Sequence, residues 1–63
     1  MNTRSDTFTF YKDRNKEWRW NRIAGNGRIV GASAEGYKNK ADCIENAIRN
    51  GYDSRIHTTK FED

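Results

Sequence analysis

Two short runs of alternating aromatic and polar residues constrain the fold of this chain more than any other feature. Phe8 and Phe10 share one face of a predicted strand, and Trp18 and Trp20 share a face of the next. The Gly-Asn-Gly segment at 25–27 is typical of a tight hairpin turn, because Asn and Gly tolerate positive φ. The pattern predicts a small antiparallel sheet with one apolar face.

A third strand and a helix complete the expected unit. Ile29 and Val30 are the apolar residues of the third strand. Asn39 is expected to cap a helix, with Asp42 three residues later in capping-box register, and Gly51 to end it. The sequence therefore predicts strands over 7–12, 17–24 and 28–34, a helix between 39 and 51, and a short last strand over 55–59.

These elements make an α+β fold, in which a three-stranded antiparallel meander packs on one helix in the order β-β-β-α, with a short C-terminal strand. We expect one domain over 7–60, between a flexible N-terminus at 1–6 and a C-terminal tail at 61–63. The apolar stripe of the helix is expected to cover the sheet face that carries the aromatic residues. The uncovered face and the strand edges are then the expected binding surfaces.

Size and composition limit how such a domain is stabilised. A chain of 63 residues buries a modest core, and its single cysteine, Cys43, excludes an internal disulfide. With His57 as the single histidine, neither a tetrahedral zinc site nor any cofactor is expected. We therefore expect homodimerisation to add stability. The absence of disulfides and of a signal peptide indicates a cytoplasmic protein, and no apolar run is long enough to span a membrane.

The charge of the chain is positive and uneven. The net charge is +3 and the predicted isoelectric point 9.3, with +5 over residues 1–40 and −2 over residues 41–63. Five cations cluster around the first turn and second strand: Arg14, Lys16, Arg19, Arg22 and Arg28. A basic sheet face can bind nucleic acid or an acidic protein. The favoured interpretation is that these residues keep a small surface solvated.

Several short motifs follow one another in a specific order along the chain. They are carried by Phe8, Phe10–Asp13, Glu17–Trp20, Ala24–Gly27, Glu35–Tyr37, Lys40, Ala41 and Cys43. Their order and spacing resemble the YegP-like family of small bacterial and archaeal proteins. This resemblance implies a β-β-β-α unit that occurs as a tandem repeat or as a single unit that pairs, and hence a homodimer here. It implies no particular reaction.

Two features depart from the pattern of that family, and both lie on the predicted second and third strands. Arg22 and Ile23 invert the usual order of an apolar residue followed by a polar one. The segment 26–37 is one residue longer than usual, and a bulge near Gly31 is expected to accommodate the extra residue.

Individual side chains favour binding over catalysis. Trp18 and Trp20 are expected in the core, where each buries a large area. Cys43 is expected to lie buried on the helix stripe, and His57 to be exposed and inert. No catalytic residue and no metal ligand is predicted, and the chain is not expected to be an enzyme.

Three functions follow from these features. The first is a non-catalytic module that acts as a homodimer and contacts a protein partner. The second is nucleic-acid binding by the basic sheet face, and the third is inhibition of a host defence complex by a phage or mobile-element protein. The residues expected to bind a partner or nucleic acid are Tyr11, Arg19, Arg22, Arg28 and Tyr37.

Overall fold

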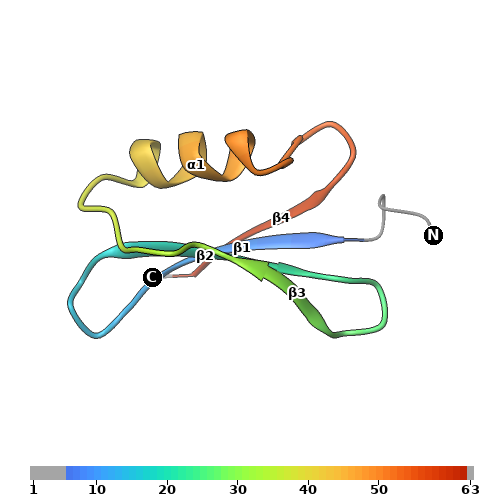
Figure 1. Cartoon of the computed structure of the whole chain (residues 1–63), viewed down its shortest axis with the longest axis horizontal. Helices are drawn as coiled ribbons and strands as arrows, with labels where there is room; N and C mark the ends of the chain where they lie inside the picture. The colour runs from blue at the N-terminus through green and yellow to red at the C-terminus, as the bar shows by residue number, and fades with distance from the viewer. Residues whose placement is uncertain (1–5, 63) are drawn as a thin grey trace.

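The computed structural model describes residues 6–62, which form a four-stranded sheet with one helix packed across one face (Figure 1). The elements are β1 (Thr7–Lys12), β2 (Trp18–Ile23), β3 (Ile29–Ala32), α1 (Lys40–Arg49) and β4 (Thr58–Glu62). The strand order is β3-β2-β1-β4, in which β4 runs parallel to β1 and the other pairs are antiparallel. The predicted α+β class, meander and helix are confirmed, and β4 makes the sheet mixed. No helix within 6–62 is long and apolar enough to cross a membrane.

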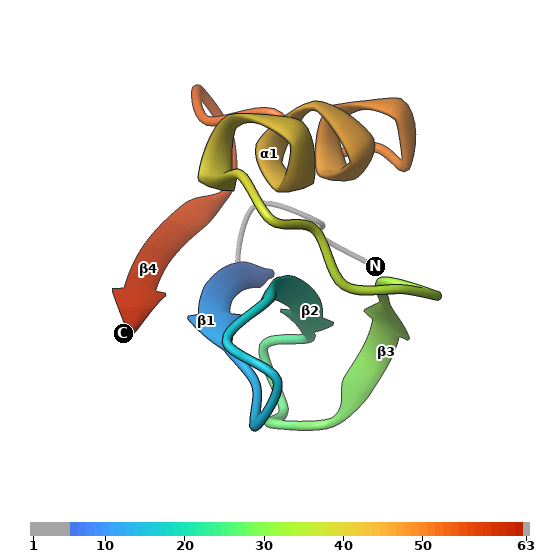
Figure 2. The same cartoon turned by 90° about the vertical axis from the view of Figure 1, so that its left-hand side faces the viewer.

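The core lies between α1 and the sheet face that α1 covers, which we call the inner face (Figure 2). It consists of Phe8, Phe10, Trp18, Trp20, Cys43, Ala47 and Tyr52. Trp20 also donates its indole N–H to Asn46 Oδ1 of α1 over 2.8 Å, which ties the helix to β2. The prediction that the helix covers the aromatic face is therefore confirmed. The opposite face of the sheet is called the outer face below.

Two hairpin turns of the same geometry connect the antiparallel strands. In each, the fourth residue donates its N–H to the carbonyl of the first, from Lys16 to Asp13 over 3.0 Å and from Gly27 to Ala24 over 2.8 Å. That fourth residue has a positive φ in both turns, +89° at Gly27 and +62° at Lys16. The turn predicted at 25–27 is confirmed, whereas Lys16 adopts a conformation that favours glycine.

The helix begins and ends where predicted, but its first turn is capped differently. Asn39 occupies the N-cap position, yet its side chain makes no cap hydrogen bond and donates to Asp42 Oδ2 over 3.3 Å instead. At the other end Gly51 has a φ of +99°, and the Tyr52 N–H donates to the Ala47 carbonyl over 2.9 Å. This arrangement requires the left-handed backbone that glycine adopts most easily.

The last strand lies later in the chain than predicted. β4 covers Thr58–Glu62 rather than 55–59, because the backbone N–H groups of Ile56 and His57 close a turn on the Asp53 carbonyl. Phe61 pairs with Phe10 in the register of β4 and β1, and the two rings stack with their centroids 5.3 Å apart. The predicted tail at 61–63 is therefore wrong for residues 61 and 62, and residue 63 lies outside the described residues.

The end of the predicted N-terminal segment is also ordered. Residues 1–5 lie outside the described residues, but Asp6 is buried. Its carboxylate accepts a hydrogen bond from Arg22 Nε over 2.7 Å, and its carbonyl accepts one from the Thr58 N–H over 3.1 Å. Asp6 thus extends the pairing of β1 with β4 by one residue, and the expectation of a flexible segment up to residue 6 is wrong at that residue.

A β-bulge interrupts the pairing of β2 with β3. Arg22 pairs with Gly31 and Ile23 with Ile29, so Val30 is the extra residue on β3. This confirms the bulge expected near Gly31. Ile29 and Val30 remain 65% and 58% exposed, so the third strand adds little to the core.

Candidate functional site

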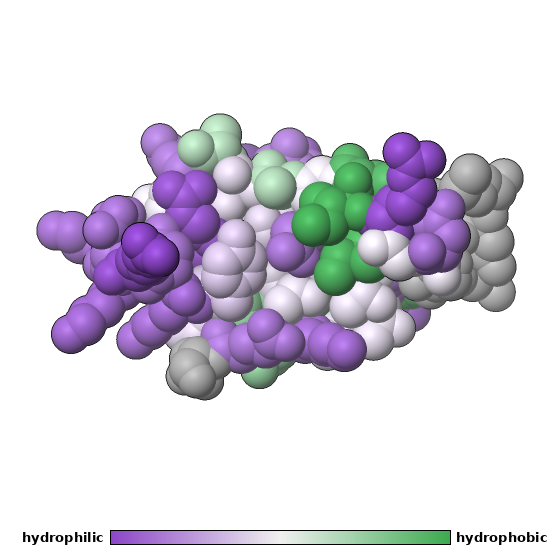
Figure 3. Space-filling view, turned by 90° about the horizontal axis from the view of Figure 1, so that it is seen from below, coloured by the Kyte–Doolittle hydropathy of each residue, from purple (hydrophilic) through white to green (hydrophobic). Residues whose placement is uncertain are grey.

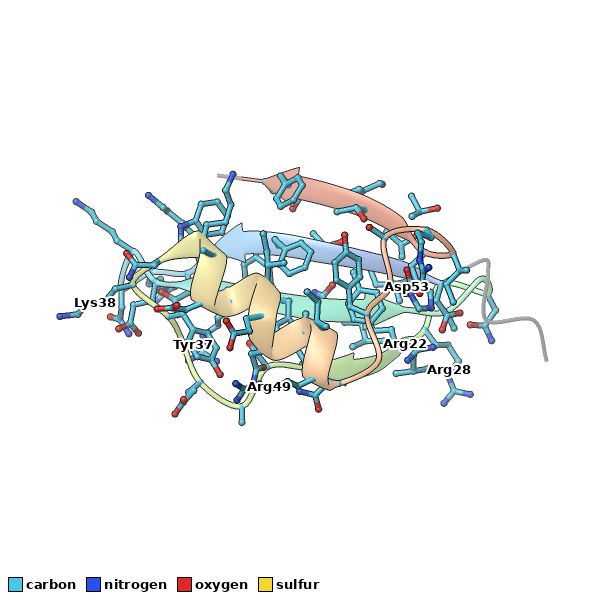
Figure 4. All side chains as sticks on the ribbon, turned by 90° about the horizontal axis from the view of Figure 1, so that it is seen from above. Arg22, Arg28, Tyr37, Lys38, Arg49 and Asp53 are labelled. Atoms are coloured by element: carbon cyan, nitrogen blue, oxygen red, sulfur yellow. The ribbon has the colours of Figure 1, made fainter. Side chains whose placement is uncertain are left out.

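The five residues predicted to bind a partner do not form one surface. Tyr11 and Arg19 are cross-strand neighbours on the outer face, where both are half-buried. Arg28 is exposed just before β3, at the opposite end of the molecule from Lys38 (Figure 4). Tyr37 lies beside α1, where its backbone pairs with that of Trp18.

Arg22 lies on the inner face, which corrects the expectation that it contributes to the uncovered face. Side chains alternate along a strand, so Arg22 shares the face of Trp18 and Trp20. Its guanidinium lies 5.4 Å from the ring centroid of Phe8, and its Nε lies 2.7 Å from Asp6 Oδ2. Arg22 therefore packs against the edge of the core, and its charge is already paired with that of Asp6.

Arg19 lies on the outer face, as predicted, but its charge is also paired. Its Nε donates to Asp13 Oδ2 over 2.7 Å, and the other oxygen of that carboxylate accepts the backbone N–H groups of Asn15 and Glu17. The Arg19 hydrogen bond is the main reason that the pKa of Asp13 is below its usual range. The pair stabilises the turn between β1 and β2 rather than providing a free cation.

Tyr37 lines a shallow acidic pocket beside α1. The pocket has a volume of about 390 Å³ and is lined by Glu35, Tyr37, Asp42, Glu45, Asn46 and Arg49. Burial, with a further contribution from the Glu35 carboxylate, raises the pKa of the Tyr37 hydroxyl. The three carboxylates give this pocket the opposite charge from the basic surface that Tyr37 was predicted to join.

The single cysteine and the single histidine are both buried. Burial raises the pKa of the Cys43 thiol to about 11, so it stays protonated near neutral pH. His57 is 7% exposed, which corrects the expectation of an exposed histidine. Its ring packs 5.1 Å from that of Phe8, and its Nδ1 accepts the backbone N–H of Asp53 over 3.0 Å. The burial of His57 follows from the turn that precedes β4.

β4 has the most open edge of the sheet. It is the last strand in the sheet order, and no other element of the described chain lies beyond it in Figures 2 and 4. Its pairing with β1 is regular along its whole length, and four of its residues are exposed, including Phe61 at 51%. An edge strand of this kind offers unpaired backbone groups to a second chain.

The β3 edge is less suited to pairing. β3 has four residues and carries the bulge at Val30, and short or bulged strands protect a sheet edge from pairing. Ile29 and Val30 of β3 are exposed, and Figure 3 shows an apolar patch on the outer face of the molecule. The two edges therefore differ, and the edge of β4 is the candidate functional site.

The side chains of β4 alternate between the two faces. Thr58, Lys60 and Glu62 lie on the outer face, opposite Thr7, Thr9 and Tyr11 of β1. On the inner face, the Thr59 hydroxyl shares a hydrogen bond of 2.6 Å with that of Tyr52, and Phe61 lies 4.7 Å from the Lys40 amino group. Reasoning from the sequence missed this site by ending the strand at 59. The polar residues that alternate with Phe61 are the sequence pattern that would have predicted a strand continuing past residue 59.

Comparison with known proteins identifies a family. A family model described as a domain of unknown function (DUF1508) matches residues 13–56, which is more than half of the chain. The matched region contains β2, β3 and α1, whereas β1 and β4 lie outside it. No curated protein and no solved structure matches the chain.

Proposed function

This chain belongs to the DUF1508 family, the domain that YegP-like proteins carry, and we propose that it acts as a small non-catalytic interaction module in the form of a homodimer. The observation that carries the proposal is the open edge of β4, which is regular, exposed and unpaired among the described residues. Two copies of β4 pair antiparallel about a two-fold axis and join two four-stranded sheets into one.

The charges on β4 select the register of this pairing. Centred on Phe61, the pairing places Lys60 of each copy opposite Glu62 of the other on the outer face, and the two Phe61 rings next to each other on the inner face. Centred on Lys60, it would place two lysines opposite each other, which is unfavourable. The Phe61 register is therefore the complementary one.

The chemistry of the buried residues supports a role without catalysis. The Cys43 thiol is fully buried and has a raised pKa, so it is a poor nucleophile. His57 is buried, and its Nδ1 already accepts a hydrogen bond from Asp53. The homodimer instead leaves its outer face, with Tyr11 and the patch at Ile29 and Val30, for contact with a protein partner.

A charge exchange on β4 tests the dimer. Lys60→Glu alone and Glu62→Lys alone each place like charges opposite one another, twice per dimer because of the two-fold axis. Each is expected to weaken dimerisation by about 10- to 100-fold, which corresponds to about 1.4–2.8 kcal/mol. The double variant, Lys60→Glu with Glu62→Lys, restores the complementary pairing. Sedimentation velocity over a concentration series measures the dimer dissociation constant of each protein.

Ile29→Ser on the exposed β3 edge is the control and should leave the dissociation constant unchanged. Circular dichroism checks that each variant is folded. If the two single variants dimerise as well as the wild type, or if the double variant fails to recover, the β4 pairing is wrong. The interpretation as a phage or mobile-element inhibitor stays a prediction, because no observation on the described residues favours it.

A further inference from the structure

The end of the molecule formed by the β1–β2 turn and the start of α1 gathers exposed cations, of which Lys40 lies next to Phe61 and so borders the proposed dimer contact. We call this surface the basic end. It consists of Lys12, Arg14, Lys16, Lys38 and Lys40, all of which are exposed. Figure 4 shows Lys38 extending away from the body of the molecule at this end, and Figure 3 shows hydrophilic side chains concentrated there.

The backbone pairing brings these cations together from three segments of the chain. Lys12 pairs with Trp18 across β1 and β2, and Trp18 pairs in turn with Tyr37, which directly precedes Lys38. The amino groups of Lys12 and Lys40 lie 5.5 and 5.3 Å from the ring centroid of Trp18. One indole ring therefore lies next to cations from β1 and from the first residue of α1.

The charges of the basic end are free among the described residues. The ion pairs of residues 6–62 involve Arg19, Arg22, Arg49 and Arg55, and none involves a lysine. The nearby carboxylate of Asp13 is occupied by Arg19. Three other carboxylates, those of Glu17, Asp42 and Glu62, lie in the adjoining segments, so the five cations still outnumber them there.

Lys16 is placed in this surface at a conformational cost. Its φ of +62° costs a residue with a Cβ about 1–2 kcal/mol, whereas the matching position of the second hairpin is Gly27. The two turns have the same backbone hydrogen bonds, so the backbone pattern of the turn does not account for the lysine. Strained residues of this kind concentrate at functional sites, and here the strained residue adds a cation to the basic end.

We propose that the basic end binds the phosphate backbone of a nucleic acid, without reading its sequence. Lysine is depleted in protein–protein interfaces, whereas lysine and arginine supply the phosphate contacts of nucleic-acid-binding proteins. The site differs from the sheet face predicted from the sequence, since Arg19 and Arg22 are paired and five cations without an ion pair among the described residues gather at one end. Binding through it does not depend on the dimer.

Fluorescence anisotropy with a short labelled DNA duplex of mixed sequence, and with its single strand, tests the proposal. Affinity is expected in the range of non-specific binding, about 10⁻⁴–10⁻⁶ M near physiological salt, and to fall steeply between about 50 and 200 mM salt. Lys16→Gln with Lys38→Gln is expected to weaken binding at least about tenfold at low salt. It should also reduce the slope of log K against log salt by about 2.

Arg28→Gln with Arg49→Gln is the matched control, since it removes the same charge from other parts of the surface. It should leave most of the affinity intact. A second variant, Lys12→Gln with Lys40→Gln, is expected to lose binding in the same way, with circular dichroism to check its fold. Equal losses in the control and the test variants would overturn the proposal. So would an absence of binding at low salt, or tighter binding of labelled polyglutamate than of DNA.

Discussion

Asp53 and Arg55 form a local pair that makes the stability of the turn before β4 depend on pH. The Arg55 side chain and backbone N–H donate hydrogen bonds to the Asp53 carboxylate, and these lower its pKa from 3.8 to about 2. Because the pKa is lowered on folding, the stabilisation is present above pH 3.8 and is lost as the pH falls through about 2.

Arg55→Gln is therefore expected to raise the pKa of Asp53 toward 3.8 and to move this loss of stability to higher pH. The carboxyl ¹³C chemical shift of Asp53, followed by NMR from pH 5 down, measures the change. Arg49→Gln, on the helix, should leave the Asp53 titration where it is. An unchanged titration in Arg55→Gln would show that the backbone hydrogen bond alone holds the pKa down.

The left-handed conformation of Lys16 predicts a conflict between stability and binding. Lys16→Gly removes the strain at φ +62°, and after the entropy cost of glycine it should raise the free energy of unfolding by about 0.5–1 kcal/mol. Urea denaturation measures the gain, and the reverse change, Gly27→Lys, should lower stability. A loss of stability in Lys16→Gly contradicts the strain argument. The same variant should bind DNA more weakly if the basic end is a binding surface.

Burial of single residues could be predicted from the sequence where the alternation is regular. The spacing of Phe8 and Phe10, and of Trp18 and Trp20, correctly identified the core. The same alternation places Arg22 on the inner face, although the sequence interpretation counted its charge toward the outer surface. The burial of His57 was not predictable, because it depends on contacts with Phe8 that only the folded turn creates.

Among the elements, the segment between β3 and α1 depends on a close approach of Gly36 to Glu17, the residue that precedes β2. A Cβ on Gly36 would lie 2.6 Å from Glu17 Oε1 and 2.7 Å from Glu17 Cβ. Gly36→Ala is therefore expected to separate Tyr37 from Trp18 and to cost about 1–3 kcal/mol of unfolding free energy by urea denaturation.

Removing the opposing side chain should reverse part of that loss. In a double-mutant cycle, the variant Gly36→Ala with Glu17→Gly is expected to be more stable than the sum of the single effects, because the added Cβ then no longer meets the Glu17 side chain. Strictly additive effects would mean that the Glu17 contact does not limit this position. Far-UV circular dichroism should stay close to that of the wild type in all three variants.

The meander, the helix and the bulge could be predicted from local patterns, whereas β4 could not be fully placed. Hairpin turns and caps are encoded over a few residues, as Gly27 and Gly51 illustrate. β4 lies near the end of the chain and pairs with β1 near its start, and Phe61 of β4 stacks on Phe10 of β1. The candidate site lies on this least predictable element. The charges of Lys60 and Glu62 point to pairing between copies only once β4 is known to be an edge strand.

At the scale of the whole molecule, the proposed dimer and the basic end lie on adjoining parts of the structure. The last residues of β4 are level with the end of β1, where Lys12 begins the basic end. A dimer that pairs about Phe61 therefore carries two basic ends, one from each copy. Two linked phosphate-binding surfaces bind a long nucleic acid more tightly than one, so variants that break the dimer should weaken binding to long DNA more than to short DNA.

If this chain works as a pair of copies, its mass in solution must be that of two chains. Size-exclusion chromatography with multi-angle light scattering, at tens of micromolar protein and physiological salt, is the measurement. The proposed β4 dimer predicts a mass near twice the 7.4 kDa of one chain. It also predicts a lower mass for Lys60→Glu and recovery of the dimer mass when Glu62→Lys is added. A mass of one chain for the wild type under these conditions would contradict the proposed dimer.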